Sequence, residues 1–402
     1  MQGPARLVRS NEIANYKHLG PLHEWIEGKA YLLVDHVEYR GKQGAVFTYN
    51  NPPVHQMGNP ALAAYLAGFD ALVPLQEELW FLLFYTGCDP VHAGGDLKES
   101  LGRLEESNAE RSRLQAAGAG REEIDALFGW SDARIDRGFA LYKAFRTWSE
   151  KLRTVAICGG GTRFGGSAEV PLMADEIVAD SRSALCFSES QIGLIPGWGG
   201  VGRAITKAGL DNARTMAATC PIVRAHDLDR IGIYNEVVLI DWPLPRQERT
   251  DDPEADRARY VAALQKNNDE AGKLLLEAAL ASASDMAGAT YTEPAKRRKL
   301  ADPEQVAAEI ARRSNPDSYR DLWGRSLQDA RQALKELGKP LAPQSIEKLE
   351  ALLGTVDPAA WDEEAFIRAE GKADGELYRD PRFIKGILAT LQQTVADFRK
   401  VD

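Results

Sequence analysis

Apolar and polar residues follow two periodicities along the chain, and together they predict an alternation of strands and helices. Residues 30–38 and 44–49 predict two short strands joined by a turn that contains glycine. Residues 61–75 have a helical period, and the apolar run 78–85 predicts a buried strand. This order predicts a βαβ unit with parallel strands, and a glycine loop follows it directly. The loop therefore lies where open α/β sheets usually bind ligands.

The same arrangement recurs further along the chain. Residues 137–149 predict an amphipathic helix and 154–158 the next buried strand, with a second glycine loop directly after it. A further helix is expected to begin near Gly199, and a strand is expected over 233–240. Between the two loops, the charged and alanine-rich stretch 100–130 fits either a helical lid with a mobile hinge or a solvated surface excursion.

Composition narrows the class of protein. The 402 residues include 49 Lys and Arg against 59 Asp and Glu, a formal net charge of -10, which argues against nonspecific binding to nucleic acid or to an anionic membrane. The sequence has neither a signal peptide nor the roughly eighteen apolar residues of a membrane span, so we expect a soluble cytoplasmic protein. Four cysteines without a CxxC pair predict reduced core thiols rather than a metal site.

Three loops that follow predicted strands carry the candidate chemistry. Their residues are Ala93-Gly94-Gly95-Asp96, then Gly165-Gly166-Ser167-Ala168-Glu169, then Ser188-Glu189 continuing to Ile195-Pro196-Gly197-Trp198-Gly199-Gly200. Glycine leaves backbone N–H groups unshielded, and such donors stabilise a developing oxyanion by roughly 2.7–4 kcal/mol each. Carboxylates beside them can transfer protons. The three loops therefore predict one site for enolate or acyl chemistry.

The stretches "HAGGDLKE", "GGSAEVPLMADEIVAD" and "FSESQIGLIPGWGGVGR" stand in an order and spacing that resemble the crotonase superfamily of enoyl-CoA hydratases and isomerases. The resemblance covers about residues 30–240, and residues 361–393 resemble the closing helices of the family. It implies an α/β fold, a crotonase-like spiral of ββα units, here with an enlarged helical C-terminal region. We accordingly expect an N-terminal extension (1–29), a core (30–240) that includes the insertion 100–130, and a helical region (241–402) whose closing helices lie near 360–395.

The resemblance also implies the roles of individual residues. The backbone N–H groups of Ala93 and Gly166 would form an oxyanion hole for the carbonyl of a CoA thioester. Glu169 would activate water, and Glu189 would exchange a proton at the α carbon. No metal or redox cofactor is required. The residues expected to line the substrate site are Gly94, Gly95, Asp96, Lys98, Gly165, Pro196, Gly197 and Trp198.

Some of these residues have simpler explanations. Lys98 suits CoA phosphates as a point charge, but a solvated helix lysine fits equally well. Trp198 is expected in the pocket wall or the core rather than in catalysis. The basic residues 296–299 favour a solvated turn, with the 3′-phosphate of CoA as an alternative ligand.

The sequence departs from the family pattern around the first two loops. Ser167 replaces a glycine, Arg163 stands where a small apolar residue is usual, and the first loop is about two residues shorter. His92, directly before Ala93, is either an auxiliary acid or base or a core histidine. Arg163 is either a partner for a substrate carboxylate or a CoA phosphate, or a member of a structural salt bridge. These changes bear on the substrate more than on the fold.

Both glutamates favour hydration of an α,β-unsaturated acyl-CoA, in fatty acid or aromatic acid degradation. A hydrolase on the same scaffold, which opens a cyclic β-oxoacyl-CoA or cleaves the thioester, is the first alternative. An enoyl-CoA isomerase and a non-catalytic CoA-binding scaffold are the others. The family resemblance also implies a homo-oligomer, a trimer or a hexamer.

Overall fold

The computed structural model describes residues 3–243, 245–246, 249–285 and 296–399. Its internal contacts divide the chain into two compact units. Unit 1 contains residues 1–94, 141–185 and 222–298, and unit 2 contains residues 95–140, 186–221 and 299–402. Part of the helical region expected over 241–402 falls on residues outside the described ranges.

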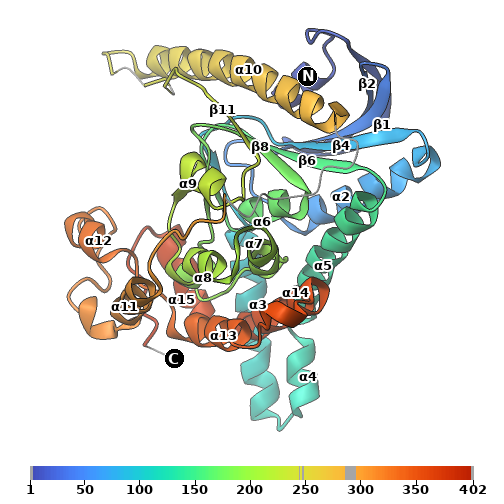
Figure 1. Ribbon diagram of the computed structural model, residues 1–402. Helices are drawn as coiled ribbons and strands as arrows, with labels where there is room; N and C mark the ends of the chain where they lie inside the picture. Colours follow the sequence, from blue (N-terminus) through green and yellow to red (C-terminus); the bar gives the residue numbers. More distant parts are fainter. Residues whose placement is uncertain (1–2, 244, 247–248, 286–295, 400–402) are drawn as a thin grey trace. The chain divides into compact units, whose positions relative to one another are not determined.

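Unit 1 is built on a seven-stranded sheet in the order β1-β2-β3-β4-β6-β8-β11 (Figure 1). Its strands are β1 (Tyr16–Glu27), β2 (Ala30–Tyr39), β3 (Lys42–Asn50), β4 (Leu79–Tyr85), β6 (Arg153–Cys158), β8 (Glu176–Asp180) and β11 (Glu236–Val238). The first three strands pair antiparallel, and every pair from β3 to β11 is parallel.

The βαβ unit expected from the sequence is confirmed. Helix α2 (Asn59–Leu72) connects β3 to β4, and the short η1 (Val73–Leu75) follows it. Strand β6 also lies where the sequence predicted a strand, parallel to β4. The strand expected over 233–240 is shorter, because only residues 236–238 pair with β8.

Strand β1 precedes the first strand that the sequence predicted. Its segment contains Gly20 and Pro21, and the pairing with β2 shifts register on each side of them. Glycine and proline weaken the strand signal because they fit only edges and bulges. Pairing with β2, rather than local propensity, therefore makes this segment a strand.

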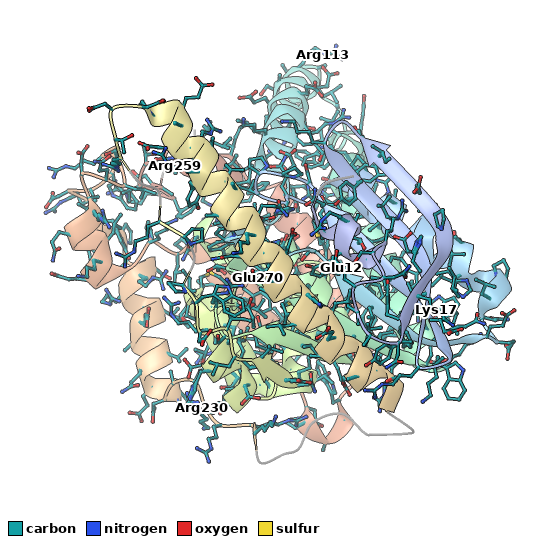
Figure 2. All side chains as sticks on the ribbon, turned by 90° about the horizontal axis from the view of Figure 1, so that it is seen from above. Glu12, Lys17, Arg113, Arg230, Arg259 and Glu270 are labelled. Carbon is teal, nitrogen blue, oxygen red and sulfur yellow. The ribbon has the colours of Figure 1, made fainter. Side chains whose placement is uncertain are left out.

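Helix α10 (Pro253–Asp285) covers one face of the sheet, as Figure 2 shows from above. Leu275, Leu276 and Leu280 pack into one buried cluster with residues of β4, β6 and β8. Glu270 and Arg259 are exposed on this helix. The helix has the length to cross several strands at about 4.8 Å spacing.

A second, four-stranded sheet lies in the order β10-β9-β7-β5. Its strands are β5 (Val91–His92), β7 (Thr162–Phe164), β9 (Ala184–Cys186) and β10 (Val223–Arg224). The remaining helices of unit 1 are α1 (Pro4–Val8), α6 (Gly166–Met173) and α9 (Ala225–Arg230). Strands β5 and β7 pair in parallel inside the two glycine loops, so they hold those loops side by side.

Unit 2 is helical. It contains α3 (Leu97–Ala116), α4 (Arg121–Ala126), η2 (Glu189–Gln191), α7 (Gly200–Ala208), α8 (Leu210–Thr219), α11 (Pro303–Ser314), η4 (Pro316–Ser318), α12 (Arg331–Leu337), α13 (Pro343–Leu353), η5 (Pro358–Ala360), α14 (Glu363–Tyr378) and α15 (Arg382–Leu391). Helix α5 (Gly129–Ser149) begins in this unit and continues into unit 1. The stretch 100–130 is helical, and α5 starts eight residues before the predicted residue 137.

Candidate active site

The two glycine loops begin at the carboxyl ends of the neighbouring parallel strands β4 and β6. Their backbones come into close contact, which explains why Gly94 has no side chain. A Cβ at Gly94 would lie 3.0 Å from Phe164 O, 3.1 Å from Gly165 Cα and 3.3 Å from the amide nitrogen of Gly166. The structure thus brings Gly94, Gly165 and Gly166 together.

Gly165 gives α6 its starting geometry. Its φ of 52° lies in the left-handed region that favours glycine, and its carbonyl accepts hydrogen bonds from the N–H groups of Ala168 and Glu169. Gly166 is the first residue of α6, where N–H groups have no acceptor within the helix. Such amides are suited to an anionic oxygen.

Glu169 lies in the first turn of the same helix. Its side chain is buried, with 3% of the residue exposed. A carboxylate in this position is favoured by the helix dipole, whose positive end is nearby. Glu169 and Gly166 therefore lie in the same first turn of α6.

The first loop is held from two sides. The Ala93 N–H donates to Val54 O at 2.6 Å, and the Met57 N–H donates to Gly94 O at 2.9 Å. From the second loop, the Ser167 hydroxyl donates to Ala93 O. The departure from glycine at Ser167 therefore supplies a link between the two loops.

Segment 51–58 is itself fixed by a polar cluster. His55 Nδ1 accepts from the Asn51 N–H at 3.1 Å, so its Nε2 carries the proton and donates to Asp89 Oδ2 at 2.7 Å. Asn268 of α10 donates to the other oxygen of Asp89 at 2.8 Å. This cluster escaped the sequence analysis because its members are far apart in the chain.

His92 and Arg163 are register partners on β5 and β7, and each residue is only 1% exposed. Burial lowers the pKa of His92 well below its usual value, and Arg163 and His55 lower it further. The Arg163 guanidinium donates to Gly159 O at 3.0 Å, Thr86 Oγ1 at 3.1 Å and Gly87 O at 3.5 Å. All three of these acceptors are neutral oxygens. Among the described residues no carboxylate pairs with Arg163, so the expected alternative of a structural salt bridge is not supported.

The other expected residues belong to unit 2. Asp96 is the N-cap of α3, where its carboxylate accepts from the N–H groups of Lys98 and Glu99 at 3.0 and 3.1 Å. Lys98 is exposed. Gly95 leaves room for the Arg134 guanidinium, which donates to Ser100 Oγ at 3.2 Å. These bonds are the usual ones of a helix start.

Glu189 begins η2 and is 7% exposed. Further along the same loop, Trp198 is buried, with the Arg134 guanidinium 5.4 Å from its ring centre. Gly197 leaves no room for a side chain beside Asp374, and Pro196 next to it is buried. Trp198 is thus packed in the interior of unit 2.

Two acids of α14 accept hydrogen bonds from the third loop and from the start of α7. Glu370 accepts from the N–H groups of Val201 and Gly202 at 3.1 and 2.9 Å, and Asp374 accepts from the Ile195 N–H at 3.2 Å. Sequence reasoning missed both residues. Their spacing of four places them on one face of a helix, and the small residues around them were the available signal.

Part of the chain matches a known protein family. The family model described as enoyl-CoA hydratase/isomerase matches residues 139–248, which include α6, Glu169 and Glu189. Residues 139–248 are thus similar to the enoyl-CoA hydratase/isomerase family, which belongs to the crotonase superfamily. An enoyl-CoA hydratase from Rhodobacter sphaeroides 2.4.1 has the same fold, with a TM-score of 0.51 and 17% identity over 89% of this chain and 90% of that one.

Two curated relatives are alpha subunits of fatty acid oxidation complexes, from Psychrobacter cryohalolentis and Psychrobacter arcticus. Each is 29% identical to this chain over 126 residues, which are 31% of this chain. The match spans only 18% of the length of either relative. The likeness to the Rhodobacter sphaeroides structure confirms the predicted crotonase-like α/β fold, and the helical C-terminal region is also present as predicted.

Features outside the loops also bear on the expectations from the sequence. All four cysteines are buried thiols, as predicted. Lys296 and Lys299 of the basic run pair with Asp229 and Asp211 at 3.2 and 2.8 Å. In the described part of the chain, no helix combines the length and apolar character needed to cross a membrane.

Proposed function

We propose that this crotonase hydrates an α,β-unsaturated acyl-CoA. The observation that carries the proposal is the buried Glu169 in the first turn of α6, a helix whose N-terminal glycines lie against the backbone of Gly94. In the proposed reaction the N–H groups of Ala93 and Gly166 polarise the thioester carbonyl. The β carbon then becomes electrophilic, and a water held by Glu169 adds there.

Glu189 carries out the second proton transfer of the proposed reaction. Addition of water leaves an enolate, and Glu189 returns a proton to its α carbon. General acid or base assistance of this kind contributes about 10²–10⁴-fold to a rate. The reaction as proposed needs no metal or redox cofactor. We also propose a homotrimer or hexamer, which light scattering of the purified protein tests.

Hydrolysis of an acyl-CoA is the second candidate, and the position of His92 favours it. His92 directly precedes Ala93, and its Nε2 atom has no hydrogen-bond partner among the described residues. A neutral imidazole can take a proton from water that attacks a carbonyl. The carbonyl is either the thioester itself or a β-oxo group in a ring, whose opening breaks a C–C bond.

One assay separates these reactions. The protein is incubated with crotonyl-CoA and with cyclic enoyl-CoA thioesters while enone absorbance and free thiol are followed together. Hydration removes absorbance without release of thiol, whereas thioester hydrolysis releases thiol. Product mass distinguishes hydration from ring opening. Binding of CoA thioesters without turnover of any of them would contradict both candidates.

A further inference from the structure

A small cavity in unit 1 lies beside the two glycine loops. Its volume is about 20 Å³, more than the roughly 10–15 Å³ that one water molecule needs. Met57, Tyr65 and Phe84 form apolar parts of its wall. The wall also contains His92, which precedes Ala93, and Ser167, which follows Gly166. The cavity therefore lies beside the two amides that we propose for the thioester oxygen.

The imidazole of His92 presents an acceptor to the cavity. Its Nε2 atom is buried and has no hydrogen-bond partner among the described residues. The ring makes its hydrogen bond to the backbone of Asp89, which leaves Nδ1 as the bonded nitrogen. Because Nδ1 donates to a carbonyl, Nε2 carries a lone pair and accepts.

Arg163 brings a guanidinium, a hydrogen-bond donor, to the same cavity. A guanidinium has five N–H groups, and the hydrogen bonds of Arg163 to described oxygens occupy three of them. The side chain is buried, with 1% of the residue exposed. Arg163 lines the cavity together with His92, its register partner.

A donor and an acceptor at one small cavity match a group that both accepts and donates. A hydroxyl does so, whereas a carboxylate or a ketone offers no hydrogen to Nε2 and an alkyl group offers neither. We propose that His92 and Arg163 form a subsite for a hydroxyl group on the acyl portion of the substrate. This inference rests on the proposed function, because it assumes a CoA thioester at Ala93 and Gly166.

Calorimetric titration with short saturated acyl-CoA thioesters tests the subsite, because these compounds have no double bond to hydrate. Each alkyl thioester is compared with analogues that carry a hydroxyl, ketone or carboxylate at successive positions of the acyl chain. We expect one hydroxyl analogue to bind about tenfold more tightly than its alkyl parent. In His92→Leu this preference disappears while affinity for the parent persists. His226→Leu, at an exposed histidine of α9, is the control that keeps the preference.

The outcomes are distinct from those of the proposed function. If no acyl-CoA binds, the proposed function fails together with the subsite. If crotonyl-CoA is turned over but hydroxyl analogues bind no better than their parents, only the subsite is overturned. A ketone or carboxylate preference that survives in His92→Leu also overturns it. A thermal melt of His92→Leu shows whether the fold persists, and Arg163→Lys, which retains the charge, supplies a second variant with the same expected loss.

Discussion

The N–H of Ala93 and the carbonyl of Val54 form a hydrogen bond of 2.6 Å. The amide that we propose for the thioester oxygen thus already has an acceptor within the protein. An oxyanion at this position must replace Val54, so segment 51–58 has to give way when substrate binds. In the structure His55 of this segment donates to Asp89, which also accepts from Asn268.

We expect this hydrogen bond to open in the substrate complex. A crystal structure with a bound saturated acyl-CoA should place Val54 O beyond hydrogen-bond distance of the Ala93 nitrogen and the thioester oxygen within it. A complex with CoA alone, which has no thioester carbonyl, should keep the bond. An intact bond in the thioester complex would show that Ala93 is not an oxyanion donor.

Glu169→Gln should lower the rate of crotonyl-CoA hydration by about 10²–10⁴-fold, because an amide cannot accept the proton of the attacking water. The KM should change little, since backbone groups bind the thioester in the proposed mechanism. Loss of absorbance under initial-rate conditions measures both constants. Glu150→Gln, at an exposed glutamate of the segment before β6, should retain the wild-type rate. An undiminished rate in Glu169→Gln would remove Glu169 from the mechanism.

Gly94→Ala should reduce turnover at least about tenfold while the protein still folds. The added Cβ would press on the backbone of residues 164–166 at 3.0 to 3.3 Å, so the Gly166 amide has to move. Movement of the Gly166 amide, the proposed oxyanion donor, should lower the rate because catalysis depends on the exact position of such groups. Steady-state kinetics and a thermal melt separate the effect on activity from the effect on stability.

Gly102→Ala is the matched substitution. Gly102 lies inside α3, and a Cβ there meets nothing within 4 Å. We expect a gain of about 0.5–1 kcal/mol in the free energy of unfolding, because alanine favours the helix, with kinetics unchanged. Equal activity losses in both variants would contradict the role assigned to Gly94.

The buried thiols should resist alkylation in the native protein. Burial raises the pKa of Cys88 to about 12 and that of Cys220 to about 12, and it also raises the pKa values of Cys158 and Cys186. At pH 8 the thiolate fraction of Cys88 is therefore on the order of 10⁻⁴. A thiol reagent should titrate no cysteine in the native protein and all of them after unfolding. Rapid native labelling would contradict this burial.

These thiols also give the stability a pH dependence. In the unfolded chain a cysteine ionises near pH 8.5, whereas the native thiols stay protonated to about pH 12. Above pH 8.5 the native state thus binds more protons than the unfolded state. The contribution of these thiols to the free energy of unfolding is therefore full below that pH and is lost as the pH rises toward 12. Each such thiol contributes a slope of about 1.4 kcal/mol per pH unit. Urea unfolding at pH 8 and pH 10 measures the loss, and Cys88→Ala should reduce the slope.

Local sequence determined the central elements of this protein. Strands β3, β4 and β6 and helix α2 carry apolar periods strong enough to predict their type and order, and parallel pairing of neighbouring strands places the two glycine loops at one edge of the sheet. Glycines also marked where backbones meet, since Gly94 and Gly165 stand at a close approach and at a left-handed turn. Local sequence also placed Glu169, which lies in the first turn of α6 shortly after the second glycine pair.

Only the tertiary structure decided the rest. Strand β1 contains glycine and proline and becomes a strand through pairing with β2. Burial, which no local pattern states, leaves His92 with an acceptor that has no described partner and surrounds Arg163 with neutral oxygens. The Val54 carbonyl meets the Ala93 amide across 39 residues of chain. Such contacts depend on which distant segments the fold brings together. They follow from the packing of the entire fold, and no local sequence pattern predicts them.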